Sequence, residues 1–324
     1  MGYLILDDIA HIDDDIHQKH KATELSEDDV LLNITGASIG RTAIATKEIE
    51  GGNVNQHVCI IRANSKVSPK FLCNYIQTKK IQNYIRSLQT GGSREGLNFD
   101  QIRSFPISLP SIAEQNKIAQ LLDKLNERIA TQNKIIDKLQ SLIKGIAQHC
   151  IRELINGWEY VRLGDICKIT TGKLDANAQV ENGKYPFFTC AERPFNIDSY
   201  AFDTEALLIS GNGANLGYIN YYKGKFNAYQ RTYVLDHFSV NIQYVKWALK
   251  VLLPQRIAIE KSSSNTPYIV LSTLADLKIP IPNNSKQNHI ADLMMSFERK
   301  LSIQLVLSDL YNKQKQYLLR QMFI

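Results

Sequence analysis

Three short motifs combine residue types that could carry out chemistry. Asn265-Thr266-Pro267-Tyr268 places an amide and an aromatic ring beside a proline, and such a set can hold a flipped nucleobase while its amine is methylated. Glu298 and Lys300 have the spacing of a Mg²⁺-binding carboxylate and a general-base lysine. The stretch 211–217 is rich in glycine, as loops that bind phosphate are.

None of these motifs has the partners that its chemistry requires. The first has one departure from the methylation box and no glycine loop after an upstream strand for a cofactor. The second lies in a heptad segment without an acidic partner, and the third lacks the dinucleotide spacing, so we expect a turn between strands. The Asp13-Asp14-Asp15 cluster is expected to be an exposed loop, and the seven His show no ligand spacing with Cys. The sequence therefore predicts no catalytic residue and no metal site.

Length and charge bound the class of protein. A chain of 324 residues has room for two domains or two repeats of one unit. Its net charge of +6 is unevenly placed, with two basic and nine acidic side chains in residues 1–40 but ten basic and four acidic in residues 41–104. The basic region permits a polyanionic partner. No apolar run approaches the roughly 18–20 residues of a membrane span, no signal peptide is evident, and five dispersed cysteines fit a reducing cytoplasm.

The sequence contains an internal repeat. Ser108–Leu122 matches Pro280–Met294 at an offset of 172 residues, with a shared proline, a shared Gln-Asn pair and a shared Ile-Ala pair. Further upstream, Leu31-Leu32 resembles Leu207-Leu208, Gly36 resembles Gly211, and Gly40 resembles Gly217. Each repeat is a Thr-, Ile-, Val- and Tyr-rich region of short strands and some helix, followed by a proline and a long helical segment. This order predicts an α+β protein with a pseudo-twofold repeat.

The two helical segments carry heptad patterns. The first, residues 113–150, has apolar residues at the a, d and e positions, and the second, 287–321, is rougher. Polar residues interrupt both at equivalent places, Arg128 with Lys300 and Gln132 with Gln304, which predicts two long antiparallel helices in a fixed register. The residues expected to pack between the helices or against a partner are Ile118, Leu125, Gln132, Ile136, Leu139, Ile290, Phe297 and Gln304.

These features together resemble the specificity subunit of a type I restriction–modification system. The duplicated Glu/Lys-Gln-Asn-x-Ile-Ala helices carry the resemblance, as does Trp158–Ile166, which looks like the start of a recognition domain. The resemblance implies target-recognition domains at residues 1–110 and 156–283, and spacer helices at 111–155 and 284–324. It also implies a cytoplasmic bacterial or archaeal protein that binds double-stranded DNA and docks two methyltransferase subunits and restriction/translocase subunits. S-adenosylmethionine, ATP and Mg would be used by those partners, and this chain would catalyse nothing.

The first recognition domain is shorter than the second. Trp158 precedes Leu207 by 49 residues, whereas Met1 precedes the equivalent Leu31 by 30, so about 19 residues are missing. We expect the counterpart of Trp158–Ile166 to be among them. Nine carboxylates make residues 7–29 a poor substitute strand, so residues 1–29 are expected to be the least ordered part of the chain.

Candidate DNA contacts occupy matched places in the two domains. Lys and Arg can hold phosphates, while Asn, Gln, Arg and Ser can bond base edges. Each domain has a polar turn near a candidate hairpin and a small, basic-flanked loop before its proline. The candidates are Asn55, Gln56, His57, Lys79, Lys80, Arg86, Ser93 and Arg94 in the first domain, and Tyr229, Gln230, Arg231, Lys261, Ser263 and Asn265 in the second.

Two other functions stay open at this point. A non-enzymatic coiled-coil scaffold with decayed recognition domains would bind DNA without sequence preference. A stand-alone DNA methyltransferase would bind S-adenosylmethionine by itself.

Overall fold

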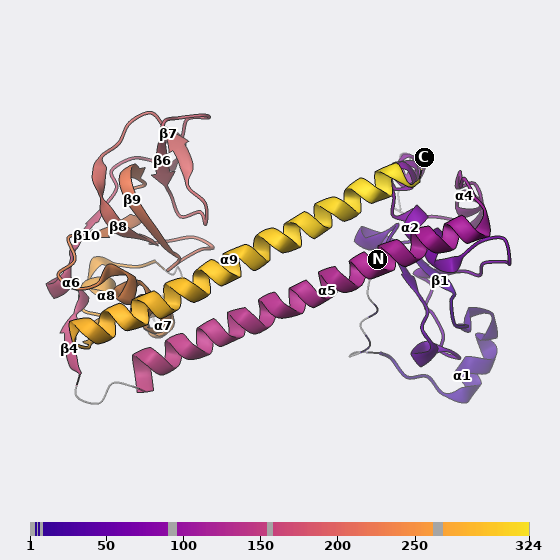
Figure 1. The fold of residues 1–324 in the computed structure, drawn as a ribbon, viewed down its shortest axis with the longest axis horizontal. Helices are drawn as coiled ribbons and strands as arrows, with labels where there is room; N and C mark the ends of the chain where they lie inside the picture. The colour runs from indigo at the N-terminus through magenta and orange to yellow at the C-terminus, as the bar shows by residue number, and fades with distance from the viewer. Residues whose placement is uncertain are drawn as a thin grey trace. The chain divides into compact units, whose positions relative to one another are not determined.

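The structure is a computed structural model that describes residues 4, 6, 9–89, 96–153, 158–261 and 268–323. It divides into two compact units. Unit 1 comprises Met1–Ile135 and Gln304–Ile324, and unit 2 comprises Ile136–Ile303 (Figure 1). Each unit therefore contains one mixed region together with part of each long helix. The domain boundaries at residues 110, 155 and 283 stay a prediction.

The described part of unit 1 has a three-stranded antiparallel sheet in the order β2-β1-β3. Its strands are β1 (Val30–Asn33), β2 (Thr42–Ile44) and β3 (Val58–Ile61). Its helices are α1 (Asp14–Lys19), α2 (Pro69–Ile76), α3 (Lys79–Gln89) and α4 (Phe99–Arg103), with short 3-10 turns at 21–23, 36–38 and 47–49. The core lies between this sheet, α2, α3 and the long helices.

Unit 2 is larger, and its described residues form a six-stranded sheet in the order β5-β10-β8-β9-β6-β7. Its strands are β5 (Lys168–Thr171), β6 (Tyr185–Phe188), β7 (Phe195–Ile197), β8 (Phe202–Ser210), β9 (Ile219–Ala228) and β10 (Thr232–Asp236). A two-stranded ribbon joins β4 (Glu159–Arg162) to β11 (Lys278–Ile281). The helices are α6 (Leu163–Ile166), α7 (Ile242–Lys261) and α8 (Leu271–Ala275), with a 3-10 turn at 176–178. The α+β class predicted from the sequence is confirmed.

The central three strands have the same order in both sheets. The order β2-β1-β3 in unit 1 recurs as β9-β8-β10 in unit 2, and the matched Leu31-Leu32 and Leu207-Leu208 pairs lie on the two central strands. Unit 2 adds β5 at one side and β6 and β7 at the other. The internal repeat of the sequence is therefore a repeat of structure.

Two long helices run from one unit into the other. Helix α5 (Ile112–Gln148) continues into a π turn at 149–153, and α9 spans Asn284–Gln321. A polar side chain begins each helix: the amide of Glu114 donates to Ser111 Oγ (3.3 Å), and the amide of Lys286 donates to Asn283 Oδ1 (3.0 Å). A proline precedes each of these caps by one residue, which keeps the chain extended there.

The ends of these helices are buried in opposite units. The start of α5 and the end of α9 pack together in the unit 1 core, where Leu122 meets Leu319 and Phe323. The end of α5 and the start of α9 pack in the unit 2 core, where Ala147 and Ile151 belong to the cluster around α7. Within each unit the helix segments are consequently antiparallel, and each unit is completed by both helices.

The buried stripe of α5 is narrower than the heptad pattern predicted. The a and e positions are buried or half-buried, but Leu121, Ile135 and Leu142 at d positions are 43–49% exposed. Arg128 is also exposed, so the expected Arg128–Lys300 polar layer is wrong, whereas Gln132 is 5% exposed and bonds to Gln304. Stripes of a/d and a/e residues have the same seven-residue period, so the period does not choose between them, and packing against the two cores decides which one is buried.

The acidic segment before β1 has defined structure where it is described. Asp13 caps α1 by accepting from the Ile16 amide, and His17 Nδ1 lies 2.7 Å from Asn53 Oδ1. Leu25 is 5% exposed. The expectation of little order is therefore wrong for residues 13–29, because turn residues 51–54 give this segment a docking surface. The Asp13–Asp15 cluster is an exposed helix start rather than a loop.

The shortening of the first domain lies after its opening motif. Tyr3-Leu4-Ile5-Leu6-Asp7-Asp8-Ile9 matches Tyr160–Ile166 at an offset of 157, so the expectation that this motif is missing is wrong. From Ile9 to Leu31 in β1 the chain is 19 residues shorter than from Ile166 to the equivalent Leu207 in β8. Unit 2 uses that additional length for β5, β6 and β7.

Candidate nucleic-acid interface

Three segments meet at one end of the unit 1 sheet. The turn 35–40 connects β1 to β2, the turn 55–57 precedes β3, and Gly96-Leu97 follows α3. The Ile34 amide donates to the carbonyl oxygen of His57 (2.9 Å), and the Leu97 amide donates to the carbonyl oxygen of Ile34 (2.8 Å). We call these three segments the first loop cluster.

The same arrangement recurs in unit 2. The Gly211 amide donates to the carbonyl oxygen of Arg231 (2.8 Å), and the Ile269 amide donates to that of Gly211 (2.9 Å). The second loop cluster therefore comprises the turn 212–217, the turn 229–231 and Ile269, joined by the neighbouring loop 189–191. The matched turns 55–57 and 229–231, proposed from sequence, are structurally equivalent.

Glycine is required at two kinds of position in these turns. Gly40 and Gly217 have φ of +84° and +81°, and Gly36 and Gly213 have φ of +70° and +78°. The structural partner of Gly36 is thus Gly213 rather than Gly211. At Gly211 a Cβ atom would lie 2.5 Å from the Arg231 carbonyl oxygen, so only glycine allows the two turns to approach. The glycine-rich stretch is a turn between strands, as predicted.

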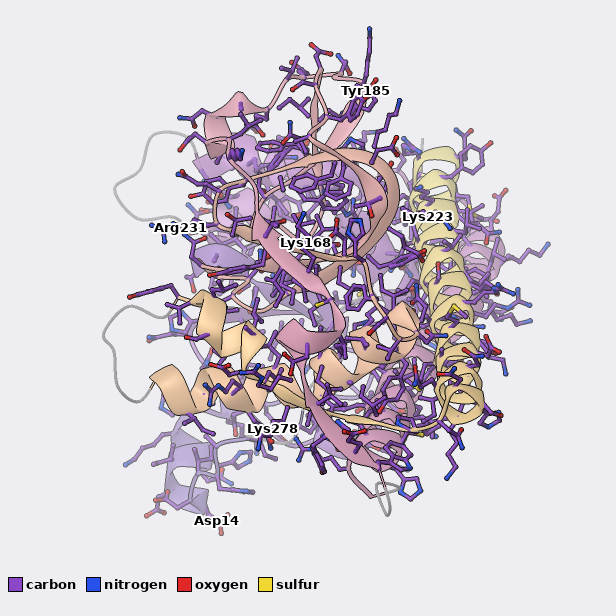
Figure 2. All side chains as sticks on the ribbon, turned by 90° about the vertical axis from the view of Figure 1, so that its left-hand side faces the viewer. Asp14, Lys168, Tyr185, Lys223, Arg231 and Lys278 are labelled. Atoms are coloured by element: carbon purple, nitrogen blue, oxygen red, sulfur yellow. The ribbon has the colours of Figure 1, made fainter. Side chains whose placement is uncertain are left out.

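The predicted polar side chains of both clusters are accessible. Asn55, Gln56 and His57 are exposed, and His57 Nδ1 lies 2.6 Å from Thr35 Oγ1. Gln230 and Arg231 are exposed, and Figure 2 shows Arg231 at the margin of unit 2, away from the sheet core. Tyr229, in the same turn, is half-buried.

Basic residues of α3 flank the first loop cluster. Gln82 Nε2 donates to the carbonyl oxygen of Gly40 (2.9 Å), which ties α3 to the turn 35–40. Lys79 and Arg86 lie three residues before and four residues after Gln82, on the same helix face, and both are exposed. Lys80 is exposed on the adjacent face.

Several candidates fall outside the described residues. Ser93, Arg94, Ser263 and Asn265 are among them, as is the side chain of Lys261. The chain that follows each of these stretches is described, and it lies in a loop cluster.

Tyr233 on β10 anchors the second loop cluster. Its Oη donates to the carbonyl oxygen of Ile269 (2.9 Å), and burial is the main cause that raises the pKa of this phenol.

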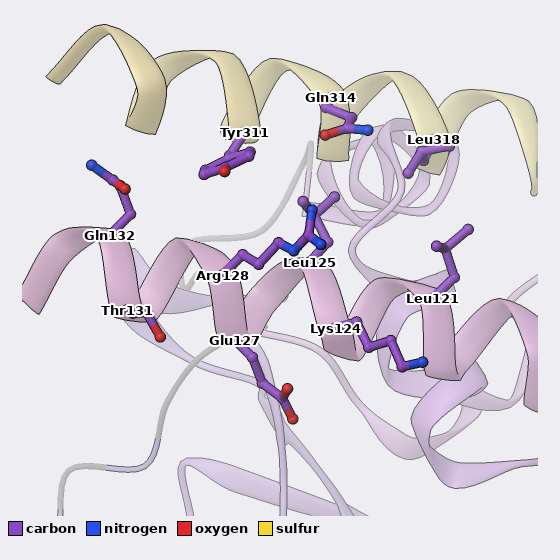
Figure 3. A pocket seen from close by; sticks show the side chains of 10 residues that line it. All are labelled: Leu121, Lys124, Leu125, Glu127, Arg128, Thr131, Gln132, Tyr311, Gln314 and Leu318. Carbon is purple, nitrogen blue, oxygen red and sulfur yellow. The ribbon is translucent and has the colours of Figure 1, made fainter. Parts of the chain in front are cut away.

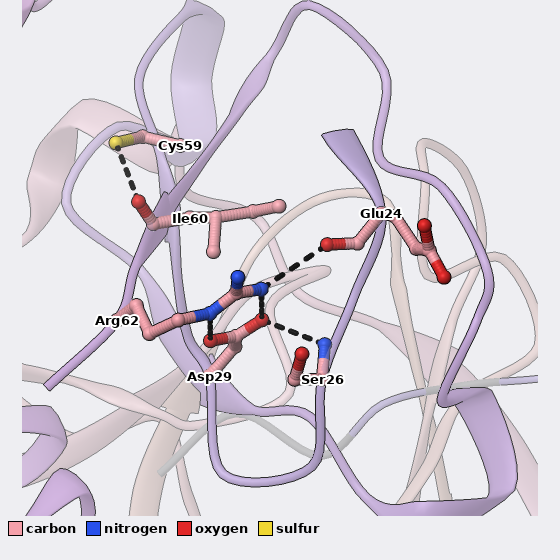
Figure 4. Close-up of polar contacts among 6 residues, drawn as sticks. All are labelled: Glu24, Ser26, Asp29, Cys59, Ile60 and Arg62. Carbon is pink, nitrogen blue, oxygen red and sulfur yellow. Dashed lines mark hydrogen bonds and ion pairs between the residues drawn. The ribbon is translucent and has the colours of Figure 1, made fainter. Parts of the chain in front are cut away.

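Arg62 is a basic residue of unit 1 whose guanidinium is paired with a buried carboxylate, so it is not among the candidate phosphate contacts. Its guanidinium donates twice to the carboxylate of Asp29, from Nε at 2.8 Å and from Nη2 at 2.7 Å (Figure 4). The Asp29 side chain is 1% exposed and also accepts from the Ser26 amide. The hydrogen bond with Arg62 holds the pKa of Asp29 below its usual range, so the pair stays charged at neutral pH.

A glutamine at the start of each long helix has a role that sequence patterns did not reveal. Gln115 is 1% exposed; its Oε1 accepts from the Ser68 amide (2.9 Å) and its Nε2 donates to the Pro110 carbonyl oxygen (2.9 Å). Gln287 is 2% exposed and does the same with the Asn241 amide and the Pro282 carbonyl oxygen. The repeated Gln of the helix motif therefore joins each long helix to the first turn of α2 or α7.

The candidate helix-packing residues lie on the buried faces of the two helices. Gln132 Nε2 donates to Gln304 Oε1 at 2.6 Å within unit 1. Four others, Ile118, Leu125, Ile136 and Ile290, are 5–9% exposed, and Leu139 and Phe297 pack at the border of the unit 2 core.

Glu298, the acidic residue of the E-x-K motif, forms two ion pairs. Its carboxylate accepts from Lys246 Nζ (2.7 Å) and Lys250 Nζ (3.0 Å), which joins α9 to α7 in unit 2. Burial opposes the charge on Glu298, but the two lysines outweigh it and lower the carboxyl pKa. Burial of Lys246 lowers the pKa of its ammonium. Among the residues that the structure describes, no cluster of three or more His, Cys, Asp or Glu could hold a metal ion.

Comparison with known proteins decides the family. The profile of the type I restriction modification DNA specificity domain matches residues 7–141 and, a second time, residues 155–306. The chain belongs to the family of type I restriction–modification specificity subunits. Each match contains one of the two loop clusters and part of one long helix, so the predicted resemblance is confirmed.

Two relatives show how far the similarity reaches. The specificity subunit of the type I restriction enzyme EcoDI from Escherichia coli is 44% identical over 135 residues, which is 42% of this chain and 30% of that subunit. The MjaIX specificity subunit from Methanocaldococcus jannaschii is 25% identical over 291 residues, 78% of this chain and 67% of that one. The chain thus spans under a third of the first relative and about two thirds of the second.

Solved structures share the fold. The S subunit of the type I restriction–modification system from M. genitalium superposes with a TM-score of 0.70 at 19% identity, covering 92% of this chain and 83% of that one. A chain from a structural study of type I system assembly and conformational transition has a TM-score of 0.59, also at 19% identity, and covers 93% of this chain and 82% of its own length. Within the described residues, no helix is both long and apolar enough to cross a membrane.

Proposed function

We propose that this chain determines the DNA sequence on which a type I restriction–modification complex acts. The observation that carries the proposal is the duplicated loop cluster, one in each family match, with polar side chains exposed on a shared backbone. Two such clusters in one chain would contact the two halves of a bipartite double-stranded target. Lys79, Lys80 and Arg86 would hold phosphates beside the first cluster.

The long helices would dock the catalytic partners. They expose apolar side chains that neither core uses, among them Ile303, Val306, Leu310 and Tyr317 at 53–57% exposure. A groove of about 550 Å³ lies beside α5 and α9 in unit 1, where Figure 3 shows Leu121 and Leu318 facing one another. Exposed apolar patches of this kind mark protein interfaces. Methyltransferase subunits would bind here and supply S-adenosylmethionine, and restriction/translocase subunits would supply ATP and Mg chemistry.

The test is to map methylated bases in a random DNA library exposed to the chain together with its methyltransferase subunits. A split consensus with two specific halves is expected. Methylation without sequence preference would support the scaffold alternative, and saturable S-adenosylmethionine binding by the isolated chain would support a stand-alone methyltransferase. Either result would contradict the proposal.

The phosphate-contact residues have a separate test. Lys79→Ala should weaken binding of the complex to every duplex and reduce the slope of log affinity against log salt by about 1. Lys278→Ala, at an exposed lysine on β11, is the matched control and should change neither quantity. An unchanged salt slope for Lys79→Ala would remove α3 from the proposed contact surface.

A further inference from the structure

The two loop clusters have one backbone and different side chains. In the turn 35–40 the Gly40 amide donates to the Asn33 carbonyl oxygen (2.9 Å), and in the turn 212–217 the Gly217 amide donates to that of Ser210 (2.8 Å). The side chains presented on this shared scaffold differ, since Ser38 of the first turn stands where the second has Asn215. The chain thus carries two loop clusters with the same backbone and different exposed side chains.

The two surfaces stand on matched interior elements. Leu31-Leu32 and Leu207-Leu208 lie on the two central strands, and the Gln115 and Gln287 clamps make the same bonds. Fixed backbone with changed polar groups is what two surfaces need when each must bond a different set of base edges.

In the second cluster, two asparagines are held in fixed orientations. Asn215 Nδ2 donates to the carbonyl oxygen of Cys190 (3.0 Å), and Cys190 Sγ donates to Asn212 Oδ1 (3.0 Å). These bonds determine which end of each amide points away from the loop 189–191. Asn215 Oδ1 and Asn212 Nδ2 have no partner among the residues that the structure describes. Within the described part of the chain, Cys190 is therefore accompanied by one amide acceptor and one amide donor that are available to a ligand.

We infer that Asn212 and Asn215 are specificity-determining residues of unit 2 and that together they select an adenine in the half-site that this unit contacts. In the major groove adenine offers a donor, its N6 amine, and an acceptor, N7. The amine would donate to Asn215 Oδ1, and Asn212 Nδ2 would donate to N7. Arg231, exposed in the adjacent turn, would hold the neighbouring backbone or base. This inference rests on the proposed function and names residues for it.

Cys190 has a positioning role in this inference. Its thiol and carbonyl groups orient the two amides but do not themselves contact the base. Replacement by serine retains a hydrogen-bond donor for Asn212, whereas replacement by alanine does not. A merely structural cysteine would respond to both changes in the same way.

The experiment maps methylation of a random library by the full complex, formed with Asn212→Ala, Asn215→Ala, Asn215→Ser, Cys190→Ala or Cys190→Ser. The asparagine variants should lower discrimination at one adenine of the second half-site by roughly 5- to 150-fold, and leave the first half-site and non-specific affinity unchanged. Cys190→Ala should have a smaller effect at the same position, and Cys190→Ser should restore most of it. Asn196→Ala, at an exposed asparagine on β7, is the matched control.

The outcomes separate the two proposals. Wild-type specificity at both half-sites in all three asparagine variants would overturn the inference while leaving the proposed function intact. Relaxation at a position that is not adenine would overturn the assignment of the base. A wild-type complex without any sequence preference would overturn the proposed function, and the inference with it. The asparagines are partly exposed, so circular dichroism of each variant should match the wild type.

Discussion

Phe323, near the end of the chain, should be a main determinant of the stability of unit 1. It is 6% exposed, and its ring lies 5.0 Å from that of Phe71 and 5.3 Å, edge on, from that of Tyr75, measured between centroids. Replacing a buried phenylalanine by alanine costs about 3–5 kcal/mol. We expect about 3 kcal/mol for Phe323→Ala, because water can enter the space left at a helix end. That loss of free energy corresponds to a roughly 100-fold larger equilibrium constant for local opening of unit 1.

Hydrogen exchange measured peptide by peptide tests this expectation, because it separates the two units of one chain. Amides of α2 should exchange roughly 100-fold faster in Phe323→Ala, while those of α7 should not change. Tyr317→Ala, at a 56% exposed residue of α9, should leave both regions as in the wild type. The reciprocal variant Ile151→Ala, at a position 1% exposed in the unit 2 core, should speed exchange in α7 alone. Unchanged exchange in α2 of Phe323→Ala would refute the view that the residues just after α9 help to complete the unit 1 core.

Three further variants test polar contacts of the interior. Arg62→Ala should lower the free energy of unfolding by about 1.5–3 kcal/mol at pH 7, as measured by urea unfolding. Because the pair lowers the pKa of Asp29, this loss of stability should fade when the same assay is run below pH ~4. Gln115→Leu leaves buried backbone groups without partners and should cost at least about 3 kcal/mol in the same assay; a cost under 1 kcal/mol would contradict the clamp role. Glu298→Ala leaves Lys246 as an unpaired buried charge and should lower the free energy of unfolding by about 3 kcal/mol. The loss should be smaller than for a fully buried pair because Glu298 is 33% exposed. A urea midpoint equal to that of the wild type would show that the ion pair does not stabilise the fold.

The family and the repeat could be deduced from the sequence alone because they depend on local chemistry. Prolines that end an extended segment, polar caps and long runs of helix-forming residues predict helices wherever they occur. The same is true of the glycine turns, since Gly40 and Gly217 stand where φ must be positive. The exposed turns 55–57 and 229–231 were found by their matched positions in the two repeats.

The tertiary structure decided which face of a helix is buried and which polar groups meet. The heptad pattern could not tell d positions from e positions, because both carry leucine and isoleucine, and only packing against the two cores distinguishes them. The role of Gln115 was hidden for a similar reason: its partners Ser68 and Pro110 are 47 and 5 residues away, and no local pattern joins all three.

The selection of Asn212 and Asn215 also depended on contacts made by distant residues. In the sequence they belong to a glycine-rich turn, and nothing there separates them from turn-forming asparagines. Cys190, more than twenty residues earlier, fixes their orientation, and it can do so only because the sheet brings the loop 189–191 beside the turn 212–217. Local sequence determined the helices, strands and turns and their repetition. Long-range contacts determined which side chains remain free to bond a base, because a side chain that is already bonded to a distant residue has fewer groups to offer.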